Sequence, residues 1–132
     1  MSRIETREAV VFFIYQTDFR KEELMDQLKI YLEANPSLED DKEYFMSTVL
    51  GVMDNREEID NKLSKFLKKW SINRIPKLDR AILETAAYEI ENNDDVHVSV
   101  TINEAVRLSK KYGAEDSSSY INGVLSSYEK SL

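Results

Sequence analysis

The sequence is poor in the residues that most often carry chemistry or interrupt regular structure. Its 132 residues include no cysteine, one histidine, one tryptophan, two prolines and three glycines. The absence of cysteine excludes disulfides, thiolate zinc sites and cysteine nucleophiles together. The single histidine, His97, lies in a polar connector with no second histidine or cysteine to share a metal, so we expect it to be solvated. No metal or other cofactor is expected.

Long apolar runs and the common catalytic motifs are also missing. The longest apolar run, residues 9–15, is too short to span a membrane, which needs about 20 residues. It follows Glu5, Arg7 and Glu8, unlike the apolar part of a secretory signal. None of the patterns GxxxxGK[ST], GxGxxG, HExxH or GxSxG occurs. We therefore expect a cytoplasmic binding protein that is not an enzyme and does not associate with membranes.

Charged side chains are plentiful but unevenly distributed. The formal net charge of −7 argues against a protein covered in positive potential. Nevertheless, residues 62–80 include seven lysines or arginines and one acidic residue, Asp79, whereas residues 39–60 are strongly acidic. The basic segment is either a solvated helix face or a local anion-binding face, and the sequence leaves both interpretations open.

Apolar residues recur at the spacing of an α-helix in almost every segment. Alternation of apolar and polar residues occurs only at Val96, Val98 and Val100, which is too short and isolated for a sheet. A clear helical example is the segment 56–70. Its apolar face comprises Ile59, Leu63, Phe66, Leu67 and Trp70.

The helical period and the breaks between segments predict an all-α fold, a compact bundle of about seven helices in one domain spanning residues 1–132. Pro36 pushes Asn35 out of the α region, and Pro76 suits a first helical turn. We expect two small lobes, roughly 1–70 and 71–132, that meet near residues 71–76. The predicted helices span residues 3–18, 22–34, 40–54, 56–70, 76–92, 101–112 and 116–130.

A polar corner, "KKYGAEDSSS" (residues 110–119), joins the last two predicted helices. Gly113 is expected to adopt the left-handed conformation that often closes a helix. Asp116 or Ser117 is expected to cap the following helix by accepting hydrogen bonds from its free N–H groups. On this interpretation the corner only turns the chain.

The same corner also has features of an anion-binding site. Free N–H groups at a helix start attract negative charge, and Lys110 and Lys111 add positive charge beside them. Tyr120, one turn into the helix, either stacks on an unpaired base or packs inward beside Ile121. The residues by themselves leave both interpretations open.

Two poor helix formers, Asn122 and Gly123, lie inside the last predicted helix. We expect Gly123 to allow close contact with another helix and Asn122 to satisfy buried backbone groups. Both expected roles are structural.

Three stretches of the chain resemble the NusB family of bacterial transcription antitermination factors. "INEAVRLSKKYGAEDSSSYINGVL" (102–125) closely resembles the family's C-terminal signature, INEAxxLAKxFG…xFVNGVL. "WSINRIPKLDRAILETAAYEI" (70–90) is similar to its W-x-x-x-R-…-x-D-R-A-I-L-R-x-A-x-Y-E-L block. "REAVVFFIYQTDF" (7–19) is similar to its R-E-x-A-x-Q-x-L-Y-x-x-D opening. The match spans nearly the whole chain in order.

This resemblance implies an all-helical fold of two subdomains and a role in antitermination. It implies binding to the boxA element of nascent ribosomal RNA transcripts together with NusE, a protein of the small ribosomal subunit. Other antitermination factors and RNA polymerase would be indirect partners. The RNA contacts that it implies are Arg3, Arg7, Asp116, Ser117 and Tyr120, beside which we place Lys110 and Lys111 on charge. The NusE-facing residues that it implies are Tyr15 and Asp79.

The chain departs from the family pattern at two places. Its N-terminal arm has only Arg3 and Arg7 where family members often carry several arginines, and each missing phosphate contact weakens RNA binding. Glu84 replaces the second arginine of the R-A-I-L-R block. For Asp79, a local ion pair or a charge at a helix N-terminus is the alternative to a partner contact.

Two other functions are compatible with the sequence. One is a protein-binding helical scaffold, or a homodimer, without RNA function. The other is the NusB-like accessory domain of RNA methyltransferases, although the chain has no S-adenosylmethionine motif.

Overall fold

The computed structural model of the chain describes residues 1–67 and 71–132 and confirms the all-α prediction. Within these residues it has seven α-helices, one 3-10 helix and no strand. None of these helices combines the length and the apolar character needed to cross a bilayer. The elements are α1 (Arg3–Thr17), α2 (Leu24–Ala34), η1 (Pro36–Asp41), α3 (Lys42–Asp54), α4 (Arg56–Ser64), α5 (Lys77–Asn92), α6 (Val98–Tyr112) and α7 (Ser117–Lys130).

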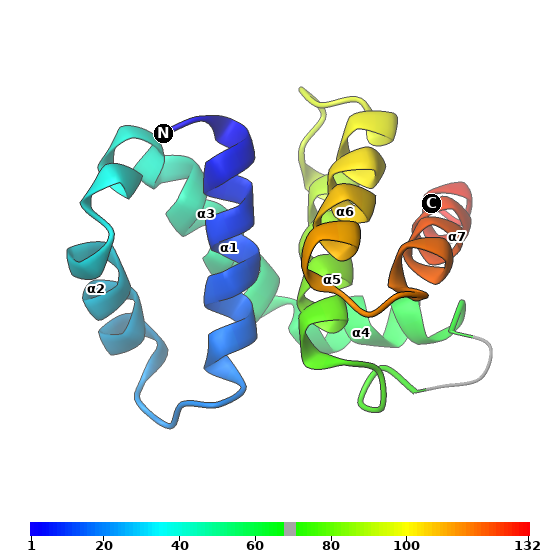
Figure 1. Cartoon of the computed structure of the whole chain (residues 1–132), viewed down its shortest axis with the longest axis horizontal. Helices are drawn as coiled ribbons and strands as arrows, with labels where there is room; N and C mark the ends of the chain where they lie inside the picture. The colour runs from blue at the N-terminus through cyan, green and yellow to red at the C-terminus, as the bar shows by residue number, and fades with distance from the viewer. Residues whose placement is uncertain (68–70) are drawn as a thin grey trace.

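The helices gather around α5, which contacts α1, α3, α4, α6 and α7. Figure 1 shows α1, α2 and α3 on one side of the molecule and α5, α6 and α7 on the other, with α4 crossing beneath α5. Every residue of α5 from Ala81 to Ala87 is buried, whereas most surface helices bury only one face. This central position explains why α5 also carries most of the buried carboxylates described below.

The core of the α1–α3 side is aromatic. The rings of Phe13 in α1 and Phe45 in α3 meet edge to face with their centroids 6.0 Å apart, and both side chains are inaccessible to solvent. Tyr31 of α2 stacks on Phe45 with a centroid separation of 5.8 Å. Such pairs contribute roughly 0.5–1.5 kcal/mol beyond the burial of their area. They fix α2, which otherwise touches few elements, onto the rest of the fold.

Several helix ends differ from those expected. The predicted helix 101–112 begins earlier, at Val98, because the His97 ring nitrogen accepts a hydrogen bond from the Ser99 N–H and caps it. The residues before α3 form a 3-10 helix after Asn35, whose φ of −130° and ψ of 70° agree with the effect predicted for Pro36. α4 ends at Ser64, and residues 68–70 of the predicted helix 56–70 lie outside the described residues.

The two-lobe division at residues 71–76 stays a prediction. The ion pairs of α4 join it to α5, since Arg56 Nε lies 2.8 Å from Glu84 and Arg80 Nη2 lies 2.7 Å from Asp60. α4 also contacts α3 and α7, and Arg56 Nη1 lies 3.0 Å from Asp18 Oδ1 at the end of α1, so α4 has neighbours on both sides of the molecule.

Candidate nucleic-acid interface

The polar corner between α6 and α7 is built differently from the prediction. Gly113 has φ −87° and ψ −180°, an extended conformation open to any residue, so the expected left-handed closure is wrong. Space is what requires glycine there. A Cβ would lie 2.7 Å from the Ser109 carbonyl oxygen and 3.1 Å from Asp79 Oδ1. The corner is thus packed too tightly for a side chain at residue 113.

The capping prediction is also wrong. Asp116 is the residue before α7, but its backbone is in the right-handed α region and its side chain makes no capping hydrogen bond. Ser117 does not cap the helix either, because its hydroxyl donates to Asp79 Oδ2 at 2.8 Å. As a result, neither the Asp116 nor the Ser117 side chain accepts a hydrogen bond from the N–H groups in the first turn of α7.

Asp79 lies beneath this corner, inaccessible to solvent. Its Oδ2 accepts hydrogen bonds from the Ser117 hydroxyl and from the Tyr120 hydroxyl. Burial and the Asp79 carboxylate both raise the pKa of the Tyr120 phenol, which therefore stays protonated as a donor. The structure thus places the predicted partner residue Asp79 in direct contact with two predicted RNA residues, and Asp79 itself offers no surface to a partner. The Ser117 side chain is buried with it.

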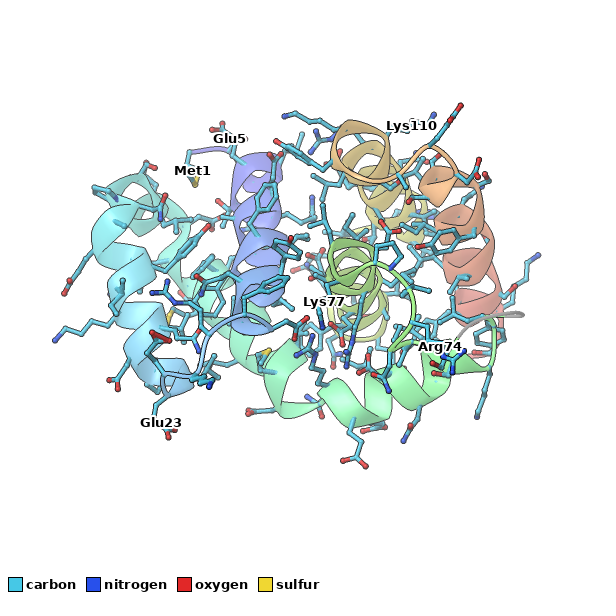
Figure 2. The ribbon with its side chains drawn as sticks, turned by 60° about the horizontal axis from the view of Figure 1, so that its bottom comes forward. Met1, Glu5, Glu23, Arg74, Lys77 and Lys110 are labelled. Carbon is cyan, nitrogen blue, oxygen red and sulfur yellow. The ribbon has the colours of Figure 1, made fainter. Side chains whose placement is uncertain are left out.

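The two lysines before the corner differ in their surroundings. Lys110 is exposed, and Figure 2 shows it at the edge of the molecule beside the end of α6. Lys111 lies 3.7 Å from Glu8 Oε1 and 5.0 Å from the centroid of the Tyr112 ring. The hydrogen bond with Tyr112 and the charge of Glu8 raise the pKa of Lys111. Both lysines are accessible from solvent.

The predicted N-terminal contacts divide into an exposed and a buried arginine. Arg3 makes a bidentate pair with Asp41, at 2.7 and 3.2 Å, and its guanidinium lies 4.0 Å from the centre of the Tyr44 ring. About half of the Arg3 side chain remains exposed. Arg7 is buried in an ion pair with Glu89, so it does not present its charge to RNA as expected.

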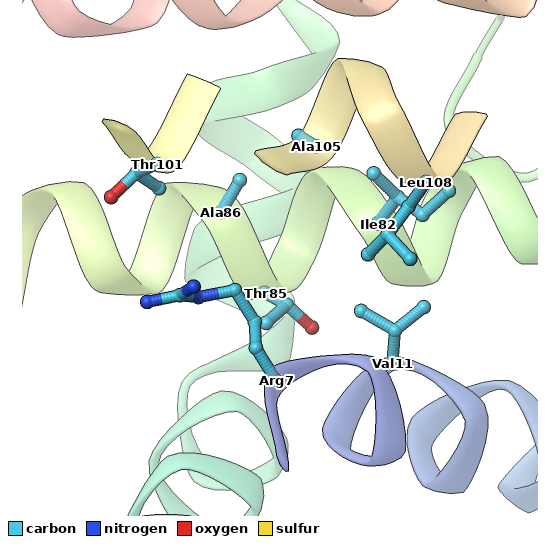
Figure 3. Close-up of a pocket in the computed structure, with 8 residues that line it drawn as sticks. All are labelled: Arg7, Val11, Ile82, Thr85, Ala86, Thr101, Ala105 and Leu108. Atoms are coloured by element: carbon cyan, nitrogen blue, oxygen red, sulfur yellow. The ribbon is translucent and has the colours of Figure 1, made fainter. Parts of the chain in front are cut away.

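Arg7 also lines a small pocket between α1, α5 and α6. Figure 3 shows Arg7 and Val11 of α1 below α5, with Thr85 between them and Thr101 of α6 above. The Thr85 hydroxyl has no hydrogen-bond partner among the described side chains and backbone. The pocket is otherwise lined by apolar atoms of Ile82, Ala86, Ala105 and Leu108. It is a packing defect between helices.

The other predicted partner residue, Tyr15, is partly buried and forms an aromatic pair with the exposed Phe19. The rings of Tyr15 and Phe19 meet edge to face with centroids 5.0 Å apart, and Phe19 is 60% exposed. Lys77, at the start of α5, places its ammonium 5.9 Å from the centre of the Phe19 ring. We call Tyr15, Phe19 and Lys77 the aromatic patch. Sequence reasoning missed Phe19, which lies in the turn just after α1, four residues after Tyr15.

The prediction for Asn122 and Gly123 is wrong, because both residues are exposed on α7. A Cβ at Gly123 would meet nothing within 4 Å. The glycine therefore permits no close helix contact, and nothing in the structure explains its presence.

Glu84, which departs from the family pattern, belongs to a buried charge network. Its Oε2 accepts from Arg56 at 2.8 Å and from Arg80 at 3.3 Å, and these arginines also pair with Asp18 and Asp60. Burial and the neighbouring Asp60 carboxyl raise the pKa of Glu84 to about 8, against the opposing effect of Arg56. A proton on Glu84 balances the network, which otherwise has three carboxylates against two guanidinium groups.

The profile of the NusB family matches residues 4–130 of the chain. The sequence is 44% identical over 125 residues to the transcription antitermination protein NusB of Acetivibrio thermocellus, covering 95% of this chain and 86% of that protein. It is 40% identical over 129 residues to the protein of the same name from Thermoanaerobacter sp., covering 97% and 90%.

Solved structures agree with the sequence comparison. T. maritima NusB is similar with a TM-score of 0.86 and 34% identity, covering 98% of this chain and 92% of that one. A NusB chain from the crystal structure of the antitermination factors NusB and NusE in complex with dsRNA has a TM-score of 0.86 and 27% identity, covering 100% of both chains. By sequence over nearly its whole length, and by fold, this chain belongs to the NusB family.

Proposed function

We propose that the chain is a non-enzymatic RNA-binding factor in transcription antitermination. It binds boxA-type RNA of nascent ribosomal transcripts together with NusE, so that RNA polymerase reads through terminators. The observation that carries this proposal is the likeness, over the full length of both chains, to a NusB that was crystallised with NusE and dsRNA. The curated relatives named as antitermination proteins support the same function.

The proposed RNA surface is the polar corner with the exposed part of the N-terminal arm. Lys110 and Lys111 provide positive charge. The Ser117 N–H donates to the Ala114 carbonyl, but the N–H groups that follow it in the first turn of α7 receive no capping hydrogen bond from Asp116 and provide donors. Tyr120 packs against the core but is only partly buried, and we propose that its accessible part stacks on a base. Asp116 is exposed and repels phosphate, so it accepts hydrogen bonds from base donors. Arg3 adds a cation once RNA competes with Asp41.

The proposed NusE surface is the aromatic patch. Aromatic rings are enriched in protein interfaces and are typical anchors there. Tyr15 near the end of α1 and Phe19 in the turn after it form an aromatic pair, and Lys77 of α5 lies beside Phe19. Asp79 is left out of this surface because its carboxylate is buried.

Fluorescence anisotropy with a boxA-like RNA oligonucleotide tests the proposal, with and without NusE and at two salt concentrations. The parent protein with NusE should bind this RNA more tightly than a scrambled RNA. Because each lysine of the corner pairs with a phosphate, Lys110→Ala or Lys111→Ala should reduce the slope of log K against log salt by about 0.7. The control variants Lys29→Ala and Lys130→Ala remove the same charge from α2 and from the far end of α7, and should leave the slope unchanged.

The same titrations separate this function from its alternatives. Binding to NusE without any preference for boxA RNA would leave a protein-binding scaffold. A lack of binding to both would overturn the proposed function.

A further inference from the structure

Two tyrosines of α7 donate hydrogen bonds to carboxylates of α5, one near each end of the helix pair. The Tyr120 hydroxyl donates to Asp79 at the start of α5, and the Tyr128 hydroxyl donates to Glu91 at 2.5 Å near its end. The two contacts are of the same chemical kind and join the same two helices. They differ in what surrounds them, and each serves as a control for the other.

The Asp79 carboxylate is more buried than the Glu91 carboxylate, whereas Tyr128 is more buried than Tyr120. Asp79 is inaccessible to solvent, whereas the Glu91 side chain is 27% exposed and also pairs with Lys62. Among the described residues, Asp79 makes no ion pair, and its two side-chain hydrogen bonds come from Ser117 of the polar corner and from Tyr120, which follows the corner in α7. Its second oxygen, Oδ1, is buried without a partner and faces the space that a Cβ of Gly113 would need.

A buried carboxylate without a cation is costly unless hydrogen bonds stabilise it. Bonds from hydroxyl groups to an ionised carboxylate are short and roughly twice as strong as neutral ones. The Ser117 and Tyr120 side chains are therefore held firmly, and the first turn of α7 is held with them. Gly113 lets the chain pass close enough for this contact to form.

We propose that Asp79 is a positioning residue for RNA binding, which holds the first turn of α7 and the Tyr120 ring in the orientation that RNA recognises. This inference rests on the proposed function. Asp79 does not touch RNA and acts only through Ser117 and Tyr120. The hydrogen bond to Asp79 restricts the motion of the Tyr120 ring before RNA binds. Less conformational entropy is then lost on binding, and such preorganisation increases affinity.

The test measures binding of the same boxA-like RNA in the presence of NusE. Tyr120→Phe keeps the ring and removes the hydroxyl, and Asp79→Asn keeps the shape and removes the charge. Each should raise the Kd about fivefold to tenfold, which corresponds to the net contribution of one typical intramolecular hydrogen bond. The salt dependence should stay unchanged, because neither variant removes a cation that pairs with phosphate. Tyr128→Phe and Glu91→Gln should change the Kd less than about twofold.

A double-mutant cycle tests whether Asp79 affects RNA binding through Ser117 and Tyr120. In the background Ser117→Ala with Tyr120→Phe, Asp79→Asn should change the Kd by less than about twofold, because the groups through which it acts are gone. Hydrogen exchange should show faster exchange at residues 113–120 in Asp79→Asn, and not in Glu91→Gln.

The outcomes distinguish this inference from the proposed function. If the parent binds RNA and both Asp79→Asn and Tyr120→Phe bind equally well, Asp79 only supports the fold and the proposed function stands. If Tyr128→Phe weakens RNA binding as much as Tyr120→Phe, the effect is a general loss of stability and the inference fails. If the parent does not bind RNA, the proposed function fails, and a positioning role toward RNA fails with it.

Discussion

Arg7 and Glu89 form a buried ion pair in which the arginine Nε lies 3.1 Å from both carboxylate oxygens. Their side chains are 7% and 2% exposed. The Tyr44 hydroxyl donates to the same carboxylate, and burial together with Glu89 raises the pKa of this phenol. Helices α1, α3 and α5 therefore meet at Glu89, and Arg7 has a structural role.

Replacing Arg7 by alanine should destabilise the fold. Glu89 would be left as a buried charge without its cation, and breaking such a pair costs about 3–5 kcal/mol. Urea unfolding measures this loss. Arg3→Ala is the matched control, because an exposed pair contributes less than about 1 kcal/mol. An Arg7→Ala protein as stable as the parent, with a reduced salt dependence of RNA binding, would instead identify Arg7 as a phosphate contact.

The raised pKa of Glu84 should make stability fall with rising pH. The folded protein keeps a proton on Glu84 up to a pKa of about 8, whereas the unfolded chain releases it near the ordinary value of 4.5. The contribution to the free energy of unfolding is therefore fully present below about pH 4.5, declines as pH rises and levels out above about 8. Glu84→Gln should remove this decline in urea unfolding between about pH 5.5 and 8.5.

Glu91→Gln provides a comparison of opposite sign. Although burial raises the pKa of Glu91, hydrogen bonds from Tyr128 and Lys62 outweigh it and lower that pKa. Glu91 therefore contributes stability that is lost on acidification.

A Glu84→Gln protein with the same decline as the parent between about pH 5.5 and 8.5 would show that Glu84 is ionised in the folded state.

Alanine at Gly113 and at Gly123 should have opposite effects on stability. At Gly113 the added Cβ would lie 2.7 Å from a backbone oxygen, and such overpacking costs about 1–3 kcal/mol. At Gly123 the Cβ meets nothing, so the higher helix propensity of alanine should stabilise α7 by up to about 1 kcal/mol. The melting temperatures of the two variants, measured by thermal unfolding, test both expected changes in stability. A stable Gly113→Ala protein would mean that the corner adapts easily.

Phe19→Ala should weaken NusE binding with little effect on the fold. An exposed ring contributes little to stability, whereas truncation of an aromatic anchor typically costs about 2 kcal/mol or more of binding energy, or over tenfold in Kd. Isothermal titration calorimetry with NusE measures the change. Met25→Ala, which removes a similarly exposed apolar side chain from α2, is the control. Equal affinities of the parent and Phe19→Ala would exclude the aromatic patch as the interface.

The amino-acid sequence by itself determined the class of fold and the family. Helical periodicity is a local property, so the helices could be predicted from the spacing of apolar residues such as Leu63, which is fully buried. The break after Asn35 followed from Pro36 for the same reason. The family followed from long motifs in their order along the chain. Helix ends were less accurate, because a cap such as His97 depends on a single hydrogen bond.

Only the tertiary structure decided which polar residues are available to RNA or a partner. Arg7 and Glu89 are separated by 82 positions in the chain, and Ser117 lies 38 positions from Asp79. Arg7 and Arg3 occupy the same arm, yet one is buried and the other is half exposed. Nothing in the local pattern distinguishes them, because the burial of a charge depends on which distant side chain the fold brings within hydrogen-bonding distance.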